Sequence, residues 1–181
     1  MDLEKQYLLQ NYGRYPLAVR RGKGTWLYDF NGKRYMDLIS GIGVNALGHA
    51  HPRLTRVIRE QAGLLIHCSN LYFHEYQGKL AEKLAKISGL QRSFFCNSGT
   101  EANEAAIKLV RLRTDGKRYK IVTFRGGFHG RTMGSVSATA QPKHHEGLGP
   151  MVAGFQYAPH GDLEAVEKLI DEHTGRSEEH R

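Results

Sequence analysis

Short apolar runs separated by turn residues dominate the start of the chain. Between Leu17 and Leu38, the segment Thr25-Trp26-Leu27-Tyr28 is rich in β-branched and aromatic residues, which suit the surface of a sheet. Turn residues flank it at 22–24 and at Asn31-Gly32, a dipeptide that favours tight hairpins. The pattern predicts a small antiparallel meander, preceded by a short helix over residues 3–12.

Apolar residues at helical spacing predict two helices in the middle of the chain. The first opens with Pro52, a residue that suits the first helical turn, and runs to about Ile66, while the second spans residues 74–87. Each has one apolar stripe, made by Leu54, Val57, Ile58, Ala62 and Leu65 in the first and by Leu80, Leu84 and Ile87 in the second. The glycine- and histidine-rich residues 40–51 before them are predicted to form a loop.

Strand-like and helical segments alternate from Arg92 onward. Strands are predicted at 93–96, 120–124, 135–138 and 154–157, and helices at 100–113 and 162–173. Such alternation predicts an α/β fold with a parallel or mixed sheet and crossover helices. We expect an N-terminal segment over residues 1–55, the first part of a larger domain over 56–175, and a polar tail over 176–181.

Composition and charge narrow the function only slightly. The 26 basic and 18 acidic residues give a net charge of +8, but the basic residues are scattered, which favours a solvated surface over a nucleic-acid site. Cys68 and Cys96 have no metal-site spacing and predict reduced thiols in a cytoplasmic protein. No secretory signal and no membrane-spanning run is expected. His49 and His51 lack a cluster of acidic or cysteine ligands, so no metal site is predicted.

A strand, a polar turn and a helix start come together at Phe95-Cys96-Asn97-Ser98-Gly99-Thr100-Glu101. Ser98 and Glu101 have the spacing of a capping box. Gly99 leaves the backbone open to an anion, which free amides at a helix N-terminus bind, and Thr100 adds a hydroxyl donor. On the residues alone, a phosphate site and an ordinary capped helix are both possible.

A second candidate segment follows at Phe124-Arg125-Gly126-Gly127-Phe128-His129-Gly130-Arg131-Thr132. Its glycines allow a sharp bend after a strand, where open α/β sheets bind ligands. Phe128 has a face that can stack on a flat ring, and Arg131 has the fork that matches a carboxylate. The alternatives are a core aromatic and a surface charge, and His129 is expected to support the segment without touching a substrate. His144 and His145 are expected to be solvated.

Residues 97–108, Asn-Ser-Gly-Thr-Glu-Ala-Asn-Glu-Ala-Ala-Ile-Lys, closely resemble the phosphate-binding segment of class III aminotransferases, which are fold-type I pyridoxal-phosphate enzymes. The resemblance extends from about residue 10 to 174. It implies that Gly99 and Thr100 hold the phosphate of pyridoxal 5′-phosphate through their amides. It also implies that Phe128 covers the cofactor ring and that Arg131 holds the substrate carboxylate.

Within that family, residues 40–52 and 69–72 resemble the acetylornithine-type members. Ile42 stands where ornithine-type members tend to carry a tyrosine, and an apolar residue there suits an N-acylated substrate. The resemblance implies N2-acetylornithine and 2-oxoglutarate as substrates, in arginine biosynthesis, and a homodimeric parent. The alternatives are a class III enzyme for succinylornithine, ornithine, 4-aminobutyrate or a diamine, or a non-catalytic basic binding protein.

The resemblance also implies that two catalytic groups lie beyond the C-terminus of this sequence. These are the lysine that forms a Schiff base with the cofactor and the aspartate that keeps the pyridine nitrogen protonated. We therefore expect a truncated fold-type I chain without catalytic residues and without transaminase activity. The polar ending Arg176-Ser177-Glu178-Glu179-His180-Arg181 replaces the apolar strand expected there, which suggests a frameshift or an early stop.

Overall fold

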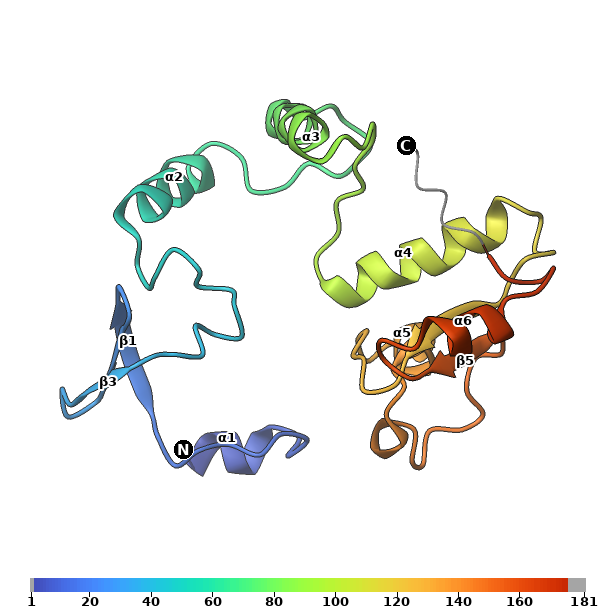
Figure 1. Ribbon diagram of the computed structural model, residues 1–181. Coiled ribbons are helices and arrows are strands. Elements are labelled where there is room, and N and C mark those ends of the chain that lie inside the picture. Colours follow the sequence, from blue (N-terminus) through green and yellow to red (C-terminus); the bar gives the residue numbers. More distant parts are fainter. Residues whose placement is uncertain (1, 176–181) are drawn as a thin grey trace. The chain divides into compact units, whose positions relative to one another are not determined.

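The computed structural model describes residues 2–175, and the chain divides into two compact units, Met1–His74 and Glu75–Arg181 (Figure 1). The division predicted at residue 55 stays a prediction. The predicted polar tail, residues 176–181, lies outside the described residues. None of the helices in the described part is both long enough and apolar enough to cross a membrane.

The first unit contains the predicted antiparallel meander, formed by β1 (Val19–Lys23), β2 (Trp26–Asp29) and β3 (Arg34–Met36) in that order. Leu27 of β2 faces Tyr35 of β3 across the ladder. The β2–β3 turn is fixed by Asp29, whose Oδ1 accepts the amides of Asn31 and Lys33 at 2.9 Å each. The meander is thus confirmed, together with its turn at Asn31-Gly32.

Two helices flank the meander in sequence, and both are shorter than the sequence predicts. α1 covers Asp2–Tyr7 and α2 covers Pro52–Ala62. The residues between β3 and α2 form turns, as predicted, and His49 is held there by Asp37, whose Oδ2 lies 2.7 Å from its Nε2. This histidine contact lowers the pKa of Asp37. His49 therefore has a structural partner in the first unit.

The second unit is built on two parallel strands, β4 (Ile121–Phe124) and β5 (Phe155–Ala158), with Thr123 opposite Tyr157. Helix α6 (Leu163–Leu169) lies against β5 (Figure 1). The remaining elements are α3 (Glu75–Ser88), α4 (Gly99–Leu112), α5 (Met133–Ala138) and a 3-10 turn η1 (Pro142–His144). The parallel α/β arrangement predicted from the alternating pattern is confirmed.

The core of the second unit lies around α5, at a place where the sequence suggests a strand. Residues 134–138 are all buried and helical, so the prediction of a strand at 135–138 is wrong. The hydroxyls of Ser137 and Thr139 donate to the carbonyl oxygens of Met133 and Ser135, four residues earlier, at 2.6 and 3.0 Å. These small side chains satisfy their own hydroxyls by bonding to the backbone, so the helix can be buried although it is polar. The burial outweighs the weak intrinsic preference of serine and threonine for helices.

Residues 93–96 are irregular and exposed, so the strand predicted there is also absent from the described structure. A strand needs a neighbour to take up its backbone hydrogen bonds. Within residues 2–175, β4 and β5 pair only with each other, and no strand pairs with this segment. The apolar run Phe94-Phe95 therefore lies in the irregular segment that precedes the N-cap of α4.

Candidate functional site

The helix start at Ser98 is built as the capping-box spacing predicts. Ser98 is the N-cap of α4, and its Oγ accepts the amide of Glu101 at 3.3 Å. The Glu101 carboxylate reaches back to accept the Asn97 amide at 2.8 Å and the Ser98 hydroxyl at 2.9 Å. These hydrogen bonds, with that from the Ser98 side chain the largest, lower the pKa of Glu101. Three polar residues thus order the turn that leads into α4.

Two backbone amides remain available at this helix start. The cap accepts the N–H groups of Asn97 and Glu101. Among the described residues, the N–H groups of Gly99 and Thr100 have no acceptor. Gly99 has no left-handed φ, and a Cβ built on it meets nothing within 4 Å. The fold does not demand a glycine at this position. Its missing side chain leaves open the space in front of two amides that carry the positive end of the α4 dipole.

The second predicted segment forms a bent turn between β4 and α5, and glycine is required within it. Gly130 has φ +127°, and a Cβ there would overlap the Thr100 hydroxyl. Phe128 and Arg131 are both exposed on this turn, with the guanidinium carbon 5.6 Å from the ring centroid. No acidic side chain in the described part of the chain forms an ion pair with Arg131.

Hydrogen bonds from one face of α4 join the two predicted segments. Asn103 Nδ2 donates to the His129 carbonyl oxygen at 2.6 Å. Glu104 accepts the Ser135 amide at 3.1 Å and also the Thr132 hydroxyl. Thr100 Oγ1 lies 2.9 Å from Thr132 Oγ1. The structure therefore brings Gly99 and Thr100 beside the turn that carries Phe128 and Arg131.

The hydroxyl protons in this contact have a defined direction. A carboxylate only accepts hydrogen bonds, so the Thr132 hydroxyl donates its single proton to Glu104. The Thr100 hydroxyl then donates to Thr132 Oγ1, and its lone pair faces the Thr132 amide at 3.5 Å. In the described structure the Thr100 hydroxyl is therefore engaged with Thr132, while the amides of Gly99 and Thr100 remain as donors; that this hydroxyl also donates to an anion stays a prediction.

The contacts of Asn103, Glu104 and Thr132 were missed by the sequence reasoning. Asn103 and Glu104 follow Thr100 at helical spacings of three and four, so they lie on its face of α4. Two polar side chains on the face of a helix that also begins a predicted site were a usable signal. Their partners, residues 129–135, could not be found from spacing because they lie about thirty residues away.

His129 lies half-buried in the turn, with its amide donating to the Thr139 hydroxyl at 2.9 Å. Its Nδ1 is buried without a hydrogen-bond partner among the described residues. His144 and His145 are half-buried rather than solvated. His145 Nε2 lies within 2.9 Å of two carbonyl oxygens, those of Val136 and Thr139, and His144 packs edge-on against Phe128 at 6.0 Å. The expectation of a solvated pair is therefore wrong.

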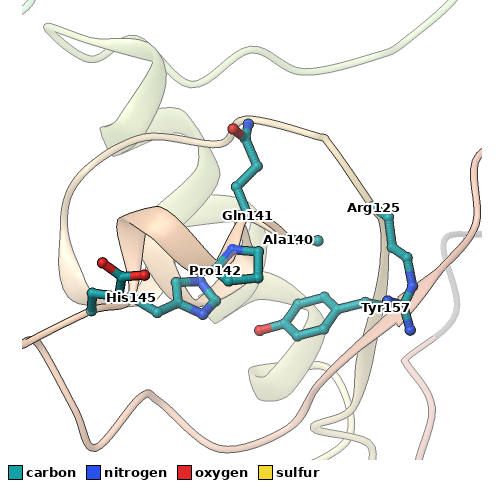
Figure 2. A pocket seen from close by; sticks show the side chains of 7 residues that line it. Arg125, Ala140, Gln141, Pro142, His145 and Tyr157 are labelled. Carbon is teal, nitrogen blue, oxygen red and sulfur yellow. The ribbon is translucent and has the colours of Figure 1, made fainter.

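A pocket of about 340 Å³ lies at the carboxyl ends of β4 and β5, and Figure 2 shows Tyr157 and Pro142 as its walls, with Arg125 at one side. Two polar side chains that line the pocket donate to backbone carbonyl oxygens. The Tyr157 hydroxyl donates to that of Ser137 at 2.8 Å, and the Gln141 amide donates to those of Gly126 and Gly127 at 3.1 Å. Burial raises the pKa of Tyr157. None of the four predicted site residues lines this pocket.

Comparison with known proteins places the chain in a recognisable group. Residues 7–180 match the model of the family described as aminotransferase class-III. The chain is 50% identical over 173 residues to the acetylornithine aminotransferase of Caldanaerobacter subterraneus, covering 93% of this chain and 44% of that protein. It is 53% identical over 172 residues to that of Aquifex aeolicus, covering 93% and 46%. The chain thus spans less than half the length of these relatives.

Solved structures share the fold of the described chain. The ornithine aminotransferase of Toxoplasma gondii superposes with a TM-score of 0.86 at 27% identity, over 93% of this chain and 41% of that one. A transaminase from the marine bacterium Virgibacillus has a TM-score of 0.86 at 24% identity, over 96% and 45%, and shows the fold alone. The two units therefore have the fold of part of a fold-type I enzyme.

Proposed function

This chain belongs to the class-III aminotransferases, and we propose that it is the cofactor- and substrate-binding front part of an acetylornithine aminotransferase. The parent reaction would transfer the δ-amino group of N2-acetyl-L-ornithine to 2-oxoglutarate, in arginine biosynthesis. The observation that carries the proposal is the joining of the α4 start to the turn of Phe128 and Arg131. The setting would be cytoplasmic and the complete parent a homodimer.

The residues present fit the phosphate end of pyridoxal 5′-phosphate. The amides of Gly99 and Thr100 are free and unobstructed, and a side chain at 99 would fill the space that a phosphate needs. Phe128 would cover one face of the ring, and Arg131 would hold the α-carboxylate with two parallel hydrogen bonds. When bound, this cofactor supplies the electron sink that lets an amino group pass between substrates.

Support for the substrate comes from the first unit and from the relatives. Proteins that share about half of the aligned residues with this chain, over less than half of their own length, are named acetylornithine aminotransferases. Ile42 lies in the 40–48 turns with φ +59°, an unusual conformation for a β-branched residue, and its side chain is exposed. An exposed apolar side chain at this position suits an N-acyl group better than a free ammonium group.

We propose that the 181-residue chain alone has no transaminase activity. The family's chemistry requires a lysine amine and an aspartate, and we assign neither role to a residue of this chain. Incubation of the purified chain with pyridoxal 5′-phosphate, N2-acetylornithine and 2-oxoglutarate should therefore form no glutamate above the enzyme-free control. Sustained glutamate formation would contradict this assignment.

Binding can be tested without any catalytic lysine. The probe is Nδ-(5′-phosphopyridoxyl)-N2-acetylornithine, a stable amine that carries the phosphate, the ring and the α-carboxylate in one molecule. We expect calorimetric binding to the wild-type chain. Arg131→Ala should weaken it about ten- to a hundredfold, because a charged hydrogen bond is worth roughly 1.5–3 kcal/mol.

Two controls make the binding result specific. Pyridoxamine 5′-phosphate lacks the carboxylate, so Arg131→Ala should leave its binding within about twofold of the wild type. Arg125→Ala removes an exposed arginine that lies outside the proposed site and should change neither affinity. If the wild-type chain binds neither compound, or if both arginine variants behave alike, the proposed site is wrong.

A further inference from the structure

Glu104 occupies the junction between the two halves of the candidate site. It is half-buried in the second turn of α4, four residues after Thr100. One carboxylate oxygen, Oε1, accepts both the Thr132 hydroxyl and the Ser135 amide. A Cβ on Gly134 would meet both oxygens and the carboxyl carbon of Glu104 within 3 Å, so this turn approaches the carboxylate closely.

We propose that Glu104 is a positioning residue that holds the Arg131 turn in register with the phosphate-binding amides of Gly99 and Thr100. This inference rests on the proposed function for its ligand, but its geometry is independent of that ligand. Glu104 acts through Thr132, the residue directly after Arg131. Its hydrogen bonds are to Thr132 and Ser135 and not to Phe128 or Arg131.

The consequence is a coupling between the two ends of a bound molecule. A ligand held only by the amides of Gly99 and Thr100 contacts only the start of α4. That start is capped by Ser98 and does not depend on Glu104. A ligand that also reaches Arg131 needs the turn 128–132 to be fixed relative to α4, and preorganisation of this kind lowers the cost of binding. Asn103 supplies a second tie, to the His129 carbonyl, but it does not touch Thr132.

Glu104 also sets the direction of the hydroxyl pair. Because its carboxylate takes the Thr132 proton, the Thr100 proton is directed to Thr132 and away from the anion site. Loss of Glu104 frees both hydroxyls to rotate and removes the acceptor of the Ser135 amide. The contacts that remain are those of Asn103 with the His129 carbonyl, of Thr100 with the Thr132 hydroxyl, and of the Ser135 hydroxyl with the Thr100 carbonyl oxygen at 3.1 Å.

The test compares two ligands on the 181-residue chain by calorimetry. Glu104→Ala should weaken the two-ended probe, Nδ-(5′-phosphopyridoxyl)-N2-acetylornithine, about tenfold while changing pyridoxamine 5′-phosphate by less than about twofold. Glu104→Gln keeps one oxygen that can accept from Thr132 and Ser135, so it should restore most of the affinity for the probe. Thr132→Val, which lacks the hydroxyl, should behave like Glu104→Ala.

Lys108→Ala is the matched control, because Lys108 is an exposed residue on α4 outside these contacts and its loss should affect neither ligand. Equal weakening of both ligands by Glu104→Ala would overturn the proposal, since it would indicate general damage to the fold. Unchanged probe binding in Glu104→Ala would overturn it as well. Far-ultraviolet circular dichroism of each variant shows whether the fold is kept.

Hydrogen exchange separates this inference from the proposed function. In the absence of any ligand, Glu104→Ala should speed amide exchange at Ser135 about tenfold or more, because that amide loses its acceptor, while Asn97 and Glu101 stay as in the wild type. If the wild type binds neither ligand, the proposed function fails and this exchange pattern still decides the role of Glu104. Unchanged exchange at Ser135 would refute it.

Discussion

At Gly99 the fold tolerates a side chain, whereas a bound phosphate would require the space that a side chain would fill. Most glycines in this chain that have a structural reason show it as a left-handed φ or a crowded neighbour, as Gly130 does. Gly99 shows neither, and an alanine would fit its backbone and its surroundings. A helix start without a side chain costs conformational entropy, which suggests that the open space has another use.

Gly99→Ala should therefore separate binding from stability. The added methyl group stands in front of the free amides, so binding of pyridoxamine 5′-phosphate should weaken by about tenfold or more. The free energy of unfolding should stay within about 0.5 kcal/mol of the wild type, as for substitutions that disturb no contact. Gly78→Ala, in the interior of α3 with open space around it, is the matched control and should leave binding unchanged. Calorimetry and urea unfolding measure the two quantities, and unchanged affinity in Gly99→Ala would contradict the phosphate role.

At the scale of whole elements, local sequence signals succeed where the element carries its own determinants. The meander follows from its turn residues, and α4 follows from Ser98 and Glu101, because the groups that fix these elements are neighbours in sequence. The same holds for α6, whose N-cap Asp162 accepts the Ala165 amide at 2.9 Å. The capped start of α4 and the glycine turn at 126–130 could thus be found before the structure.

The wrong predictions concern segments whose structure depends on partners far away in the sequence. Residues 133–138 become a helix because the surrounding unit buries them, with Ser137 also accepting the Val152 amide at 2.9 Å. Residues 93–96 have strand-like composition but no strand beside them in the described structure. The Glu104–Thr132 contact joins segments 28 residues apart, which spacing along a sequence does not reveal.

The end of α6 is tied to β4 by charge, and this tie should depend on pH. Asp171 pairs with Lys120 and accepts the His173 amide and the Thr174 hydroxyl at 3.0 Å each. The Lys120 contact, the largest cause, holds the pKa of Asp171 below its usual value of 3.8. The stabilisation is therefore complete above about pH 3.8, the unfolded-state value, and is lost as the pH falls through the lower folded-state pKa.

Asp171→Asn should consequently flatten the acid side of the stability profile. Urea midpoints of the wild type should fall as the pH drops below the usual aspartate range, and the variant should lose less over the same interval. Asp37 and Glu101 also have lowered pKa values, so part of the acid dependence should remain in the variant. Parallel profiles for the two proteins would show that the Asp171 pair contributes nothing measurable.

For the molecule as a whole, the buried apolar core is small. In the described residues the buried apolar side chains are Val136, Ala138, Ala140 and Ala158, and the largest fully buried side chain is that of Thr139. Large apolar side chains such as Leu109 and Leu112 of α4 are 64% and 72% exposed. Burial of such side chains is worth roughly 1.5–3 kcal/mol each, so their exposure leaves a strong drive to associate.

We accordingly expect the purified chain to self-associate as its concentration rises. Sedimentation velocity over a hundredfold concentration range should show a growing share of oligomers. The double variant Leu109→Gln and Leu112→Gln should lower that share without loss of helical circular dichroism, because both side chains are exposed on α4. Ser93→Gln alters an exposed polar residue and should change nothing. A wild-type chain that stays monomeric across the range would mean that these apolar surfaces are covered in solution by the chain itself, and that the core is larger than the buried residues of the described units indicate.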